Sequence, residues 1–273
     1  MSDGEDDFWS FSGRPTAERR QSEPMTGLAA EIAGRFKELF YAYDNRRSAD
    51  NRSAQETLGP SEIGTPCDRR IAFQLLGVPA VNPGGDGWAA FVGTCGHKGL
   101  AEMFEWANHG TGRYATEQAL MLPSALVPKG TADLLDRTLC MLDDHKFLGN
   151  SSLSKLRFDG PSRTYRVQLH CYAYAAVLAG ERVEHVALIA WPREAATLKG
   201  LYVWTEPYQE SIAVEALARV DRIAAQIRDT DHHGVNGELK IAAGFPTADD
   251  CGWCPWHSKT KGGCRGHEIS STR

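Results

Sequence analysis

The stretch GTADLLDRTLCMLDDHKF, residues 130–147, decides the fold of this chain. Its apolar runs are short and have turn residues between them, which predicts two consecutive strands joined in a hairpin. Asp133 lies on the first strand, and Asp144 and Lys146 lie near the end of the second. Because residues i and i+2 of a strand point to the same side, Asp144 and Lys146 project together, and the hairpin brings Asp133 alongside them.

Two carboxylates that converge at a strand end repel each other unless a cation lies between them. Hard oxygen ligands suit Mg²⁺ or Mn²⁺, and such sites retain water and bind phosphate. Lys146 would then orient an attacking water or neutralise charge that builds on phosphorus. His97, on the helix predicted before these strands, offers a nitrogen ligand. The alternative is that Asp133 and Asp136 are ordinary turn acids and that His97 is a surface residue.

The segment QLHCY, 168–172, places Gln168 and Tyr172 at positions i and i+4 of the next predicted helix, on one face. Their hydrogen-bonding tips suit the binding of a phosphate or of the active-site loop. Before this helix, KLRFDGPSRTYR carries four basic residues and one acid, and we expect a loop there that follows a nucleic-acid backbone. The basic residues are Lys155, Arg157, Arg163 and Arg166.

Hydrophobic periodicity around this block predicts helices and further strands. The expected helices cover about 26–44, a short segment after Pro66, 87–110, 164–180 and 211–229. The expected strands cover 114–122, 127–136, 138–147, 183–191 and 200–207. We expect residues 1–24 to be a disordered acidic tail and 45–62 to be a polar linker. The order helix, three strands, helix, strand predicts an α/β domain with helices packed on a central mixed sheet.

The composition is that of a globular protein, with 273 residues, 42% hydrophobic and 24% charged. The net charge of −5 argues against a surface that coats a polyanion. No run approaches the roughly 20 apolar residues that span a bilayer. The N-terminus, MSDGEDDFWSFSGRP, is acidic and unlike a cationic secretory leader. We therefore expect a cytoplasmic protein with no membrane partner.

Three of the 7 cysteines stand together in CGWCPWHSKTKGGC, residues 251–264. This spacing is that of a metal or cluster site, and also that of a redox dithiol or of two disulfide halves. In a reducing compartment, such thiols are more often ligands, catalysts or core residues than disulfides. We expect the scattered thiols of Cys95, Cys140 and Cys171 to lie in the core.

The polar residues of the central block, taken with their spacing, resemble the motifs of the PD-(D/E)XK nuclease superfamily. The similarity is closest to its RecB-like branch, in which the last helix carries a QxxxY motif. The residues that carry it are His97, Asp133 in GTAD, Asp144 and Lys146 in DHK, and Gln168 and Tyr172. The arrangement of one cysteine before this core and three after it is similar to that of the iron–sulfur nucleases. These include the CRISPR-associated "Cas four" exonucleases and AddAB-type nuclease domains.

The resemblance implies a restriction-endonuclease-like core, a central mixed sheet flanked by helices. One nuclease domain would cover 25–273, with N-terminal helices at 25–110, the core at about 85–230 and a cluster-binding tail at 245–267 joined to Cys67. It also implies that Mg²⁺ or Mn²⁺ is the catalytic metal and that Lys146 is the catalytic lysine. The implied metal ligands are His97, Asp133, Asp144 and the backbone carbonyl of His145. Gln168 and Tyr172 would order the site against DNA, and Glu102 would support the first motif.

The same resemblance implies a structural [4Fe–4S] cluster at the cysteines. Its four ligands would be Cys67, Cys251, Cys254 and Cys264. A proline directly after Cys254 suits such a cluster. The alternative is a zinc site in which His257 or His267 replaces Cys67.

The expected activity is that of a Mg²⁺- or Mn²⁺-dependent DNA exonuclease acting on single-stranded or frayed ends. Recombination, repair or CRISPR-adaptation-like DNA processing would be its context, with DNA as partner and recombination or adaptation proteins as further partners. The alternative is a non-catalytic DNA-binding or scaffold module of a recombination complex, with the same cluster or a zinc site.

Overall fold

The computed structural model describes residues 26–52, 57–82, 87–230, 237–248, 251, 254–258 and 264–266. The expected disordered tail at 1–24 lies outside these residues. The chain divides into two compact units, 1–49 and 50–273. Helix α1 (Gly27–Arg52) is the described part of the first unit and crosses the border. The helix expected over 26–44 is thus confirmed, and it extends further because neither proline nor glycine interrupts residues 45–52.

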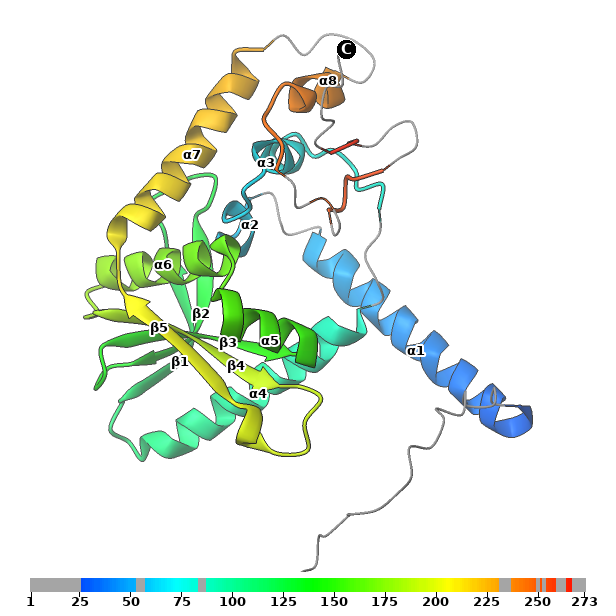
Figure 1. Cartoon of the computed structure of the whole chain (residues 1–273), viewed down its shortest axis with the longest axis vertical. Helices are drawn as coiled ribbons and strands as arrows, with labels where there is room; N and C mark the ends of the chain where they lie inside the picture. Colours follow the sequence, from blue (N-terminus) through cyan, green and yellow to red (C-terminus); the bar gives the residue numbers. More distant parts are fainter. Residues whose placement is uncertain are drawn as a thin grey trace, which may run out of the picture. The chain divides into compact units, whose positions relative to one another are not determined.

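A five-stranded sheet of order β1-β2-β3-β4-β5 forms the centre of the second unit (Figure 1). All neighbours are antiparallel except β3 and β4, which are parallel and therefore need a helical crossover between them. The strands are β1 (Tyr114–Met121), β2 (Lys129–Asp136), β3 (Met141–Leu148), β4 (His185–Pro192) and β5 (Tyr202–Pro207). The predicted α/β class with a mixed central sheet is confirmed.

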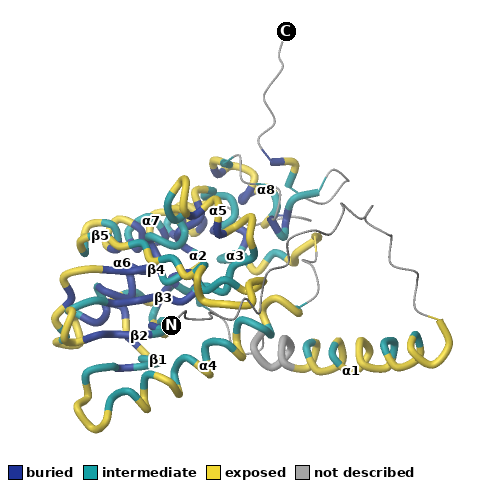
Figure 2. The backbone as a smooth tube through the Cα atoms, turned by 60° about the horizontal axis from the view of Figure 1, so that its bottom comes forward, coloured by how far each residue is buried: buried dark blue, intermediate teal, exposed yellow. Residues whose placement is uncertain are grey.

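Helices lie on both faces of this sheet. Figures 1 and 2 show α4 on one face and α6 on the other, and α7 packs on α6. The helices are α2 (Pro60–Ile63), α3 (Asp68–Leu75), α4 (Trp88–Asn108), α5 (Asn150–Asp159), α6 (Arg163–Leu178), α7 (Glu210–Arg228), α8 (Gly237–Ala243) and the short 3₁₀ turn η1 (Leu198–Gly200). None of the described helices is both long enough and apolar enough to cross a membrane.

The core lies between the sheet and α6, and the buried parts of the tube in Figure 2 follow the central strands. Helix α6 is buried over Val167–Ala173, which includes Cys171. The prediction that the other scattered thiols are core residues was wrong for Cys95, which is exposed on α4, and Cys140 is only half-buried.

Helix α5 replaces the loop that we expected over 155–166. Leu153 and Leu156, three residues apart, are buried on one side of this helix, which contacts β4. Gly160, with φ +75°, lies just beyond its end, in a conformation that glycine adopts without steric cost. The segment suggested a loop because it is rich in charged residues and only two apolar side chains, those of Leu153 and Leu156, anchor the helix.

Strands β2 and β3 pair over three residues only. The pairs are Leu134–Asp143, Leu135–Leu142 and Asp136–Met141. Beyond them β2 stays paired with β1 and β3 stays paired with β4, so the two strands separate into a fork. The next residues in this register are Asp133 and Asp144, which therefore stand at the opening of the fork.

Two arginines hold the turn between α2 and α3 against α6 and α7. Arg219 of α7 donates to the carbonyl of Thr65 at 2.6 Å and to the Asp68 carboxylate at 2.6 Å. Arg163 of α6 donates to the carbonyls of Gly64 at 2.9 Å and of Thr65 at 3.0 Å. This turn lies directly before Cys67, so the arginines fix that cysteine relative to the sheet.

Replacing Gly64 by Ala should destabilise the protein by about 1–3 kcal/mol, because overpacking has costs of this size. A Cβ at Gly64 would lie 2.5 Å from Thr164 Cα, a backbone atom of α6 that cannot turn away. Urea unfolding monitored by circular dichroism measures the change in the free energy of unfolding.

The matched control is Gly99→Ala in α4, where a Cβ meets no atom within 4 Å. That variant should gain up to about 1 kcal/mol from helix propensity. A loss at Gly99 equal to the loss at Gly64 would contradict the close contact between the α2–α3 turn and α6.

Candidate active site

The fork between β2 and β3 holds Asp133 in a network of charged and hydrogen-bonding groups. Its Oδ1 lies 3.2 Å from Nδ1 of His97 on α4, and its Oδ2 accepts the His145 backbone N–H at 2.7 Å. Burial alone would raise the pKa of Asp133, but these two donors outweigh it and lower the pKa. The bond to Asp133 in turn raises the pKa of His97, against the effect of burial.

Asp144 and Lys146 form an ion pair on the other side of the fork. Nζ of Lys146 lies 2.5 Å from Oδ2 of Asp144, whose side chain is 3% exposed. Burial raises the pKa of Asp144 to about 6, even though Lys146 attracts the ionised form. Burial would lower the pKa of Lys146, but the attraction of Asp144 outweighs it and raises the pKa. The prediction that the two side chains project together is confirmed.

Gln168 and Tyr172 position Asp144 from within the core. Nε2 of Gln168 donates to Oδ1 of Asp144 at 3.2 Å and to the Tyr172 hydroxyl at 3.0 Å. The Tyr172 ring packs over Gly130, where an added Cβ would lie 2.4 Å from a ring carbon. Both side chains are buried, and in this structure they fix the orientation of the Asp144 carboxylate. Their expected role in ordering the site against DNA stays a prediction.

Glu117, which no sequence motif indicated, lies on β1 at the same site. Among the described residues, His97, Glu117 and Asp133 form a group in which one ligand atom from each lies within 4.8 Å of the others. Asp144 is not part of this group. Burial first, and then repulsion by Asp133, raise the pKa of Glu117, while His97 opposes the rise. Oxygen and nitrogen donors of this kind fit a hard divalent cation.

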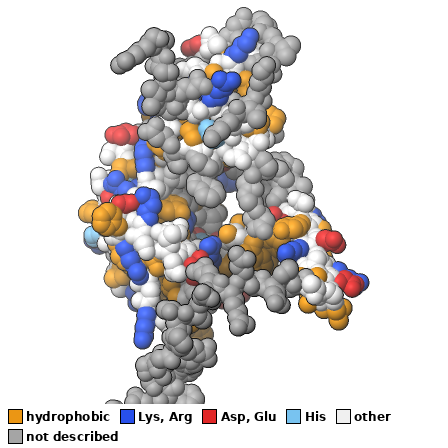
Figure 3. All heavy atoms as spheres, turned by 45° about the vertical axis from the view of Figure 1, so that its right-hand side comes forward, with side chains coloured by type: hydrophobic (Ala, Val, Ile, Leu, Met, Phe, Trp, Pro, Cys, Tyr) orange, Lys and Arg blue, Asp and Glu red, His pale blue; other side chains and the backbone are white. Residues whose placement is uncertain are grey.

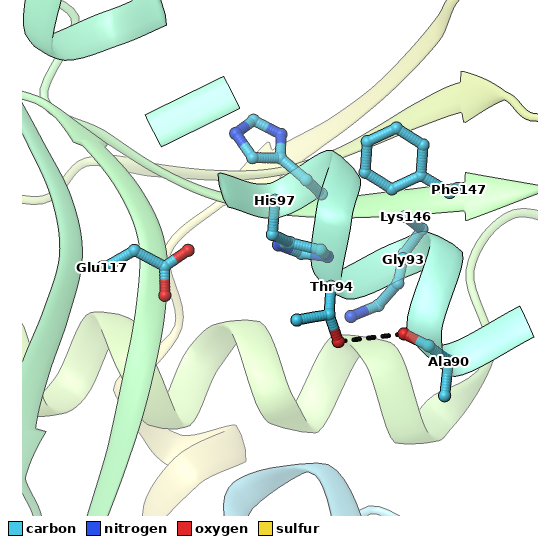
Figure 4. A pocket seen from close by; sticks show the side chains of 8 residues that line it. Ala90, Gly93, Thr94, His97, Glu117, Lys146 and Phe147 are labelled. Carbon is cyan, nitrogen blue, oxygen red and sulfur yellow. Dashed lines mark hydrogen bonds between the residues drawn. The ribbon is translucent and has the colours of Figure 1, made fainter. Parts of the chain in front are cut away.

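A cavity of about 440 Å³ lies beside this group, and His97, Glu117, His145 and Lys146 line it. Figure 4 shows Glu117 reaching from β1 toward His97 on α4. Small residues of α4 keep this space open. They are Ala90, Gly93 and Thr94.

His145 supplies its backbone to the site, while its side chain faces α4. Its ring stacks on Phe104 with centroids 5.8 Å apart and accepts a bond from Trp191 at 3.3 Å. Burial lowers the pKa of His145 to about 4, so the ring is neutral at physiological pH. The expected role of its carbonyl as a metal ligand stays a prediction. Glu102 is exposed on α4 and is not part of the group around His97.

The four basic residues expected to bind DNA make contacts within the chain. Lys155 pairs with Asp159 at 2.7 Å, and Arg166 makes a two-pronged pair with Glu206 at 2.8 and 2.7 Å. Arg157 donates to a carbonyl of η1, and Arg163 donates to the turn between α2 and α3, as described above. On the face drawn in Figure 3, Lys and Arg side chains are interspersed with acidic and apolar ones.

The early segment that contains Cys67 docks on the C-terminal segment that contains the other cysteines. Arg69 donates to the carbonyls of Phe245 and Ala243 at 3.1 and 2.8 Å and approaches the Cys264 thiol at 3.6 Å. The Phe73 ring stacks on Trp256, 5.5 Å between centroids. The fold thus brings the segment that carries Cys67 against the segment that carries Cys264.

The spacing of these thiols bears on the kind of metal group that fits them. Tetrahedral zinc with Zn–S bonds of about 2.3 Å needs sulfurs about 3.8 Å apart. Among the described residues, no three ligand atoms of Cys67, Cys251, Cys254, Cys264 and His257 lie within 4.8 Å of one another. In a [4Fe–4S] cluster each thiolate binds its own iron, so the sulfurs stand further apart. The expected [4Fe–4S] cluster and the zinc alternative both stay predictions, and His267 lies outside the described residues.

No family model and no curated protein matches this sequence. Among solved structures, an alkaline exonuclease from Laribacter hongkongensis is 11% identical with a TM-score of 0.45, over 70% of this chain and 93% of that one. The structure of SSO0001 is 18% identical with a TM-score of 0.43, over 68% and 85%. A phage-related exonuclease from Haemophilus somnus 129PT is 10% identical with a TM-score of 0.38, over 59% and 81%. With TM-scores below 0.5, these likenesses assign neither a family nor an activity.

Asp143, next to Asp144, occupies the opposite face of β3. It pairs with Leu134 and so shares a face with Asp136. Burial, followed by repulsion from Asp136 and the two site carboxylates, raises the pKa of Asp143 to about 8. Asp136 accepts from Arg113 at 2.6 Å and from two backbone N–H groups, so it is an ordinary turn acid.

In metal-free protein, the gain in stability from Asp143→Asn should grow as pH rises from about 4 to about 8. In this window the unfolded carboxyl ionises while the folded one keeps its proton, so the wild type loses free energy of unfolding. Below about pH 4 both states are protonated and the difference should level off. Urea unfolding in the presence of a chelator measures both proteins, and identical pH slopes would contradict the raised pKa.

Proposed function

We propose that this protein is a metal-dependent DNA nuclease with a restriction-endonuclease-like core of the PD-(D/E)XK type. The observation that carries the proposal is the meeting of Asp133, Asp144 and Lys146 with His97 at the fork of the sheet. Buried carboxylates repel one another at a cost, and a fork that gathers them beside an open cavity is suited to a cation and a phosphate.

The residues of the site divide the chemistry of phosphodiester hydrolysis. A divalent cation held by Asp133, Asp144, His97 and the His145 carbonyl would supply Lewis-acid activation of the phosphodiester. Lys146 would orient the attacking water and neutralise charge on the phosphoryl oxygens. Gln168 holds the Asp144 carboxylate in place through its bond to Oδ1, and Tyr172 holds Gln168.

The finer proposal is an exonuclease that acts on single-stranded or frayed DNA ends in recombination, repair or CRISPR-adaptation-like processing. It rests on the resemblance of the QxxxY helix and the cysteine pattern to RecB-like nucleases. In that context recombination or adaptation proteins would be its partners. Release of single nucleotides from an end, without internal cuts, distinguishes exonuclease from endonuclease action.

Lys146→Ala should reduce cleavage of an end-labelled oligonucleotide in Mg²⁺ or Mn²⁺ by about 10²-fold or more, as removal of a catalytic proton-transfer or charge-stabilising group does. Substrates labelled at the 5′ or the 3′ end also report the polarity of digestion. The control is Lys240→Ala, an exposed lysine on α8, which should keep full activity.

Full activity of Lys146→Ala would remove the catalytic assignment. If the wild type binds the oligonucleotide but does not cleave it in either metal, the alternative of a DNA-binding or scaffold module is correct.

We also propose that Cys67, Cys251, Cys254 and Cys264 hold a [4Fe–4S] cluster with a structural role. The docking of the Cys67 segment on the C-terminal segment supports it. The N–H of Gly266 and the Arg69 guanidinium both point at the Cys264 sulfur, at 3.4 and 3.6 Å, as donors that would stabilise a thiolate. Zinc is the alternative.

The wild type purified without oxygen should be brown and carry iron and sulfide in the ratio of one cluster per chain. Cys67→Ser should lose the visible absorbance and the iron and unfold at a lower temperature, because a tether between distant segments is lost. Cys95→Ser, which changes an exposed thiol on α4, should keep the visible absorbance, the iron and the unfolding temperature of the wild type. A colourless wild type with one zinc ion per chain would establish the zinc alternative.

A further inference from the structure

Tyr165 of α6 lies against the proposed catalytic lysine. Nζ of Lys146 stands over the Tyr165 ring, 5.2 Å from its centroid, where the negative face of the ring attracts the ammonium group. The ring is half-buried and packs against the core. The backbone N–H of Tyr165 donates to the hydroxyl of Ser162, which caps the helix. Helix α6 therefore holds this ring next to Lys146, and the mechanism proposed above gives the ring no role.

The same ring lines a second cavity, of about 230 Å³, between β3, α5 and α6. Leu148 also lines this cavity, and it follows Lys146 at i+2 of β3, so the two side chains share one face of the strand about 7 Å apart. A group bound in the cavity would therefore lie next to the lysine that faces the phosphoryl oxygens. The lining joins apolar surface from Leu148, Leu156 and Tyr165 to polar groups from Ser152, Ser162 and Lys155.

The size and the lining of this cavity suit one planar heteroaromatic ring system. The cavity is smaller than the roughly 300–1,000 Å³ of sites that enclose a drug-sized molecule, so it accepts one part of a ligand. An aromatic side chain binds a nucleobase by stacking, and it does so for every base because every base has a π-face. The hydroxyls of Ser152 and Ser162 can donate to the polar edge of a base or accept from it. Lys155 is paired with Asp159 at 2.7 Å and is not needed for this contact.

Base pairing would keep a nucleobase out of such a cavity. In a duplex each base is stacked between its neighbours and paired with its partner, so an enzyme that binds one base must first take it out of the stack. A base at a single-stranded or frayed end has no partner to lose, and the cost of binding it is lower. A cavity of this kind therefore favours unpaired ends over closed duplex.

We propose that the cavity lined by Tyr165, Leu148 and Ser152 binds the unpaired base of a nucleotide that adjoins the scissile phosphate. The inference rests on the proposed nuclease function and names the feature of the substrate that the site selects, an unstacked base beside the bond to be cut. Tyr165 contacts both this base and Lys146, so binding of the base brings the phosphate of its nucleotide to the lysine.

Single-stranded oligonucleotides that each carry one abasic nucleotide, at successive positions from either end, test this inference. Fluorescence anisotropy measures their affinities with Ca²⁺ in place of Mg²⁺, under conditions in which gel analysis shows the strand intact. With the wild type, an abasic nucleotide at one position should weaken binding about tenfold or more, as the loss of one base stacked on an aromatic ring does. Abasic nucleotides at the other positions should have little effect.

Tyr165→Leu should bind the intact strand about tenfold more weakly and should be insensitive to that abasic position, because the contact is already lost. Ser152→Leu, which fills the cavity and leaves the ring beside Lys146, should do the same. Tyr165→Phe keeps the aromatic ring and should behave as the wild type does. The matched control is Tyr174→Leu, since Tyr174 is half-buried on the opposite side of α6.

Retention of the wild-type loss at the same abasic position by either leucine variant at the cavity would overturn the base-binding cavity. A wild type that binds every abasic strand as tightly as the intact strand would overturn it as well. Both results leave the nuclease proposal standing as long as the wild type degrades the intact strand in Mg²⁺ or Mn²⁺. If the wild type shows the abasic effect but does not degrade the strand, the base-binding cavity stands and the nuclease proposal falls.

Discussion

The end of pairing between β2 and β3 is the constraint on which the site depends. If the ladder continued, Asp133 and Asp144 would be a directly opposed pair of like charges in the sheet, which destabilises a sheet. Because the strands part at that point, the two carboxylates are free to take different partners. The Asp133 carboxylate meets His97 from one face, and Asp144 meets Lys146 and Gln168 toward the other.

This division of partners gives the two acids different properties. Hydrogen bonds keep the pKa of Asp133 low, so it is ionised at neutral pH, whereas burial raises the pKa of Asp144 to about 6. At neutral pH Asp133 therefore carries its charge, whereas Asp144 titrates much closer to neutrality. The neighbouring Asp143, on the α4 side, has no such partner among the described residues, and burial raises its pKa to about 8.

The period of the strands predicted much of this arrangement, because alternation alone puts Asp144 and Lys146 together. Glu117 could not be predicted in this way, because its positive φ breaks the alternation of β1. Its position opposite Asp133 depends on the register between β1 and β2, which the sequence does not reveal. Helix α5 was missed because two leucines anchor it among charged and polar residues. The assignment of Arg166 to DNA overlooked Glu206, which only the fold brings near, and that of Lys155 overlooked Asp159, one helical turn further along α5.

The docking of the early segment on the late one sets an order in time. The strands and α6 are complete once residue 207 has been synthesised, and their core can form as the chain emerges from the ribosome. Phe73 must wait for Trp256, and Arg69 for the carbonyls at 243–245, nearly 180 residues later. The layer that carries Cys67 therefore closes only after residues 243–256 have been synthesised, later than the strands of the sheet.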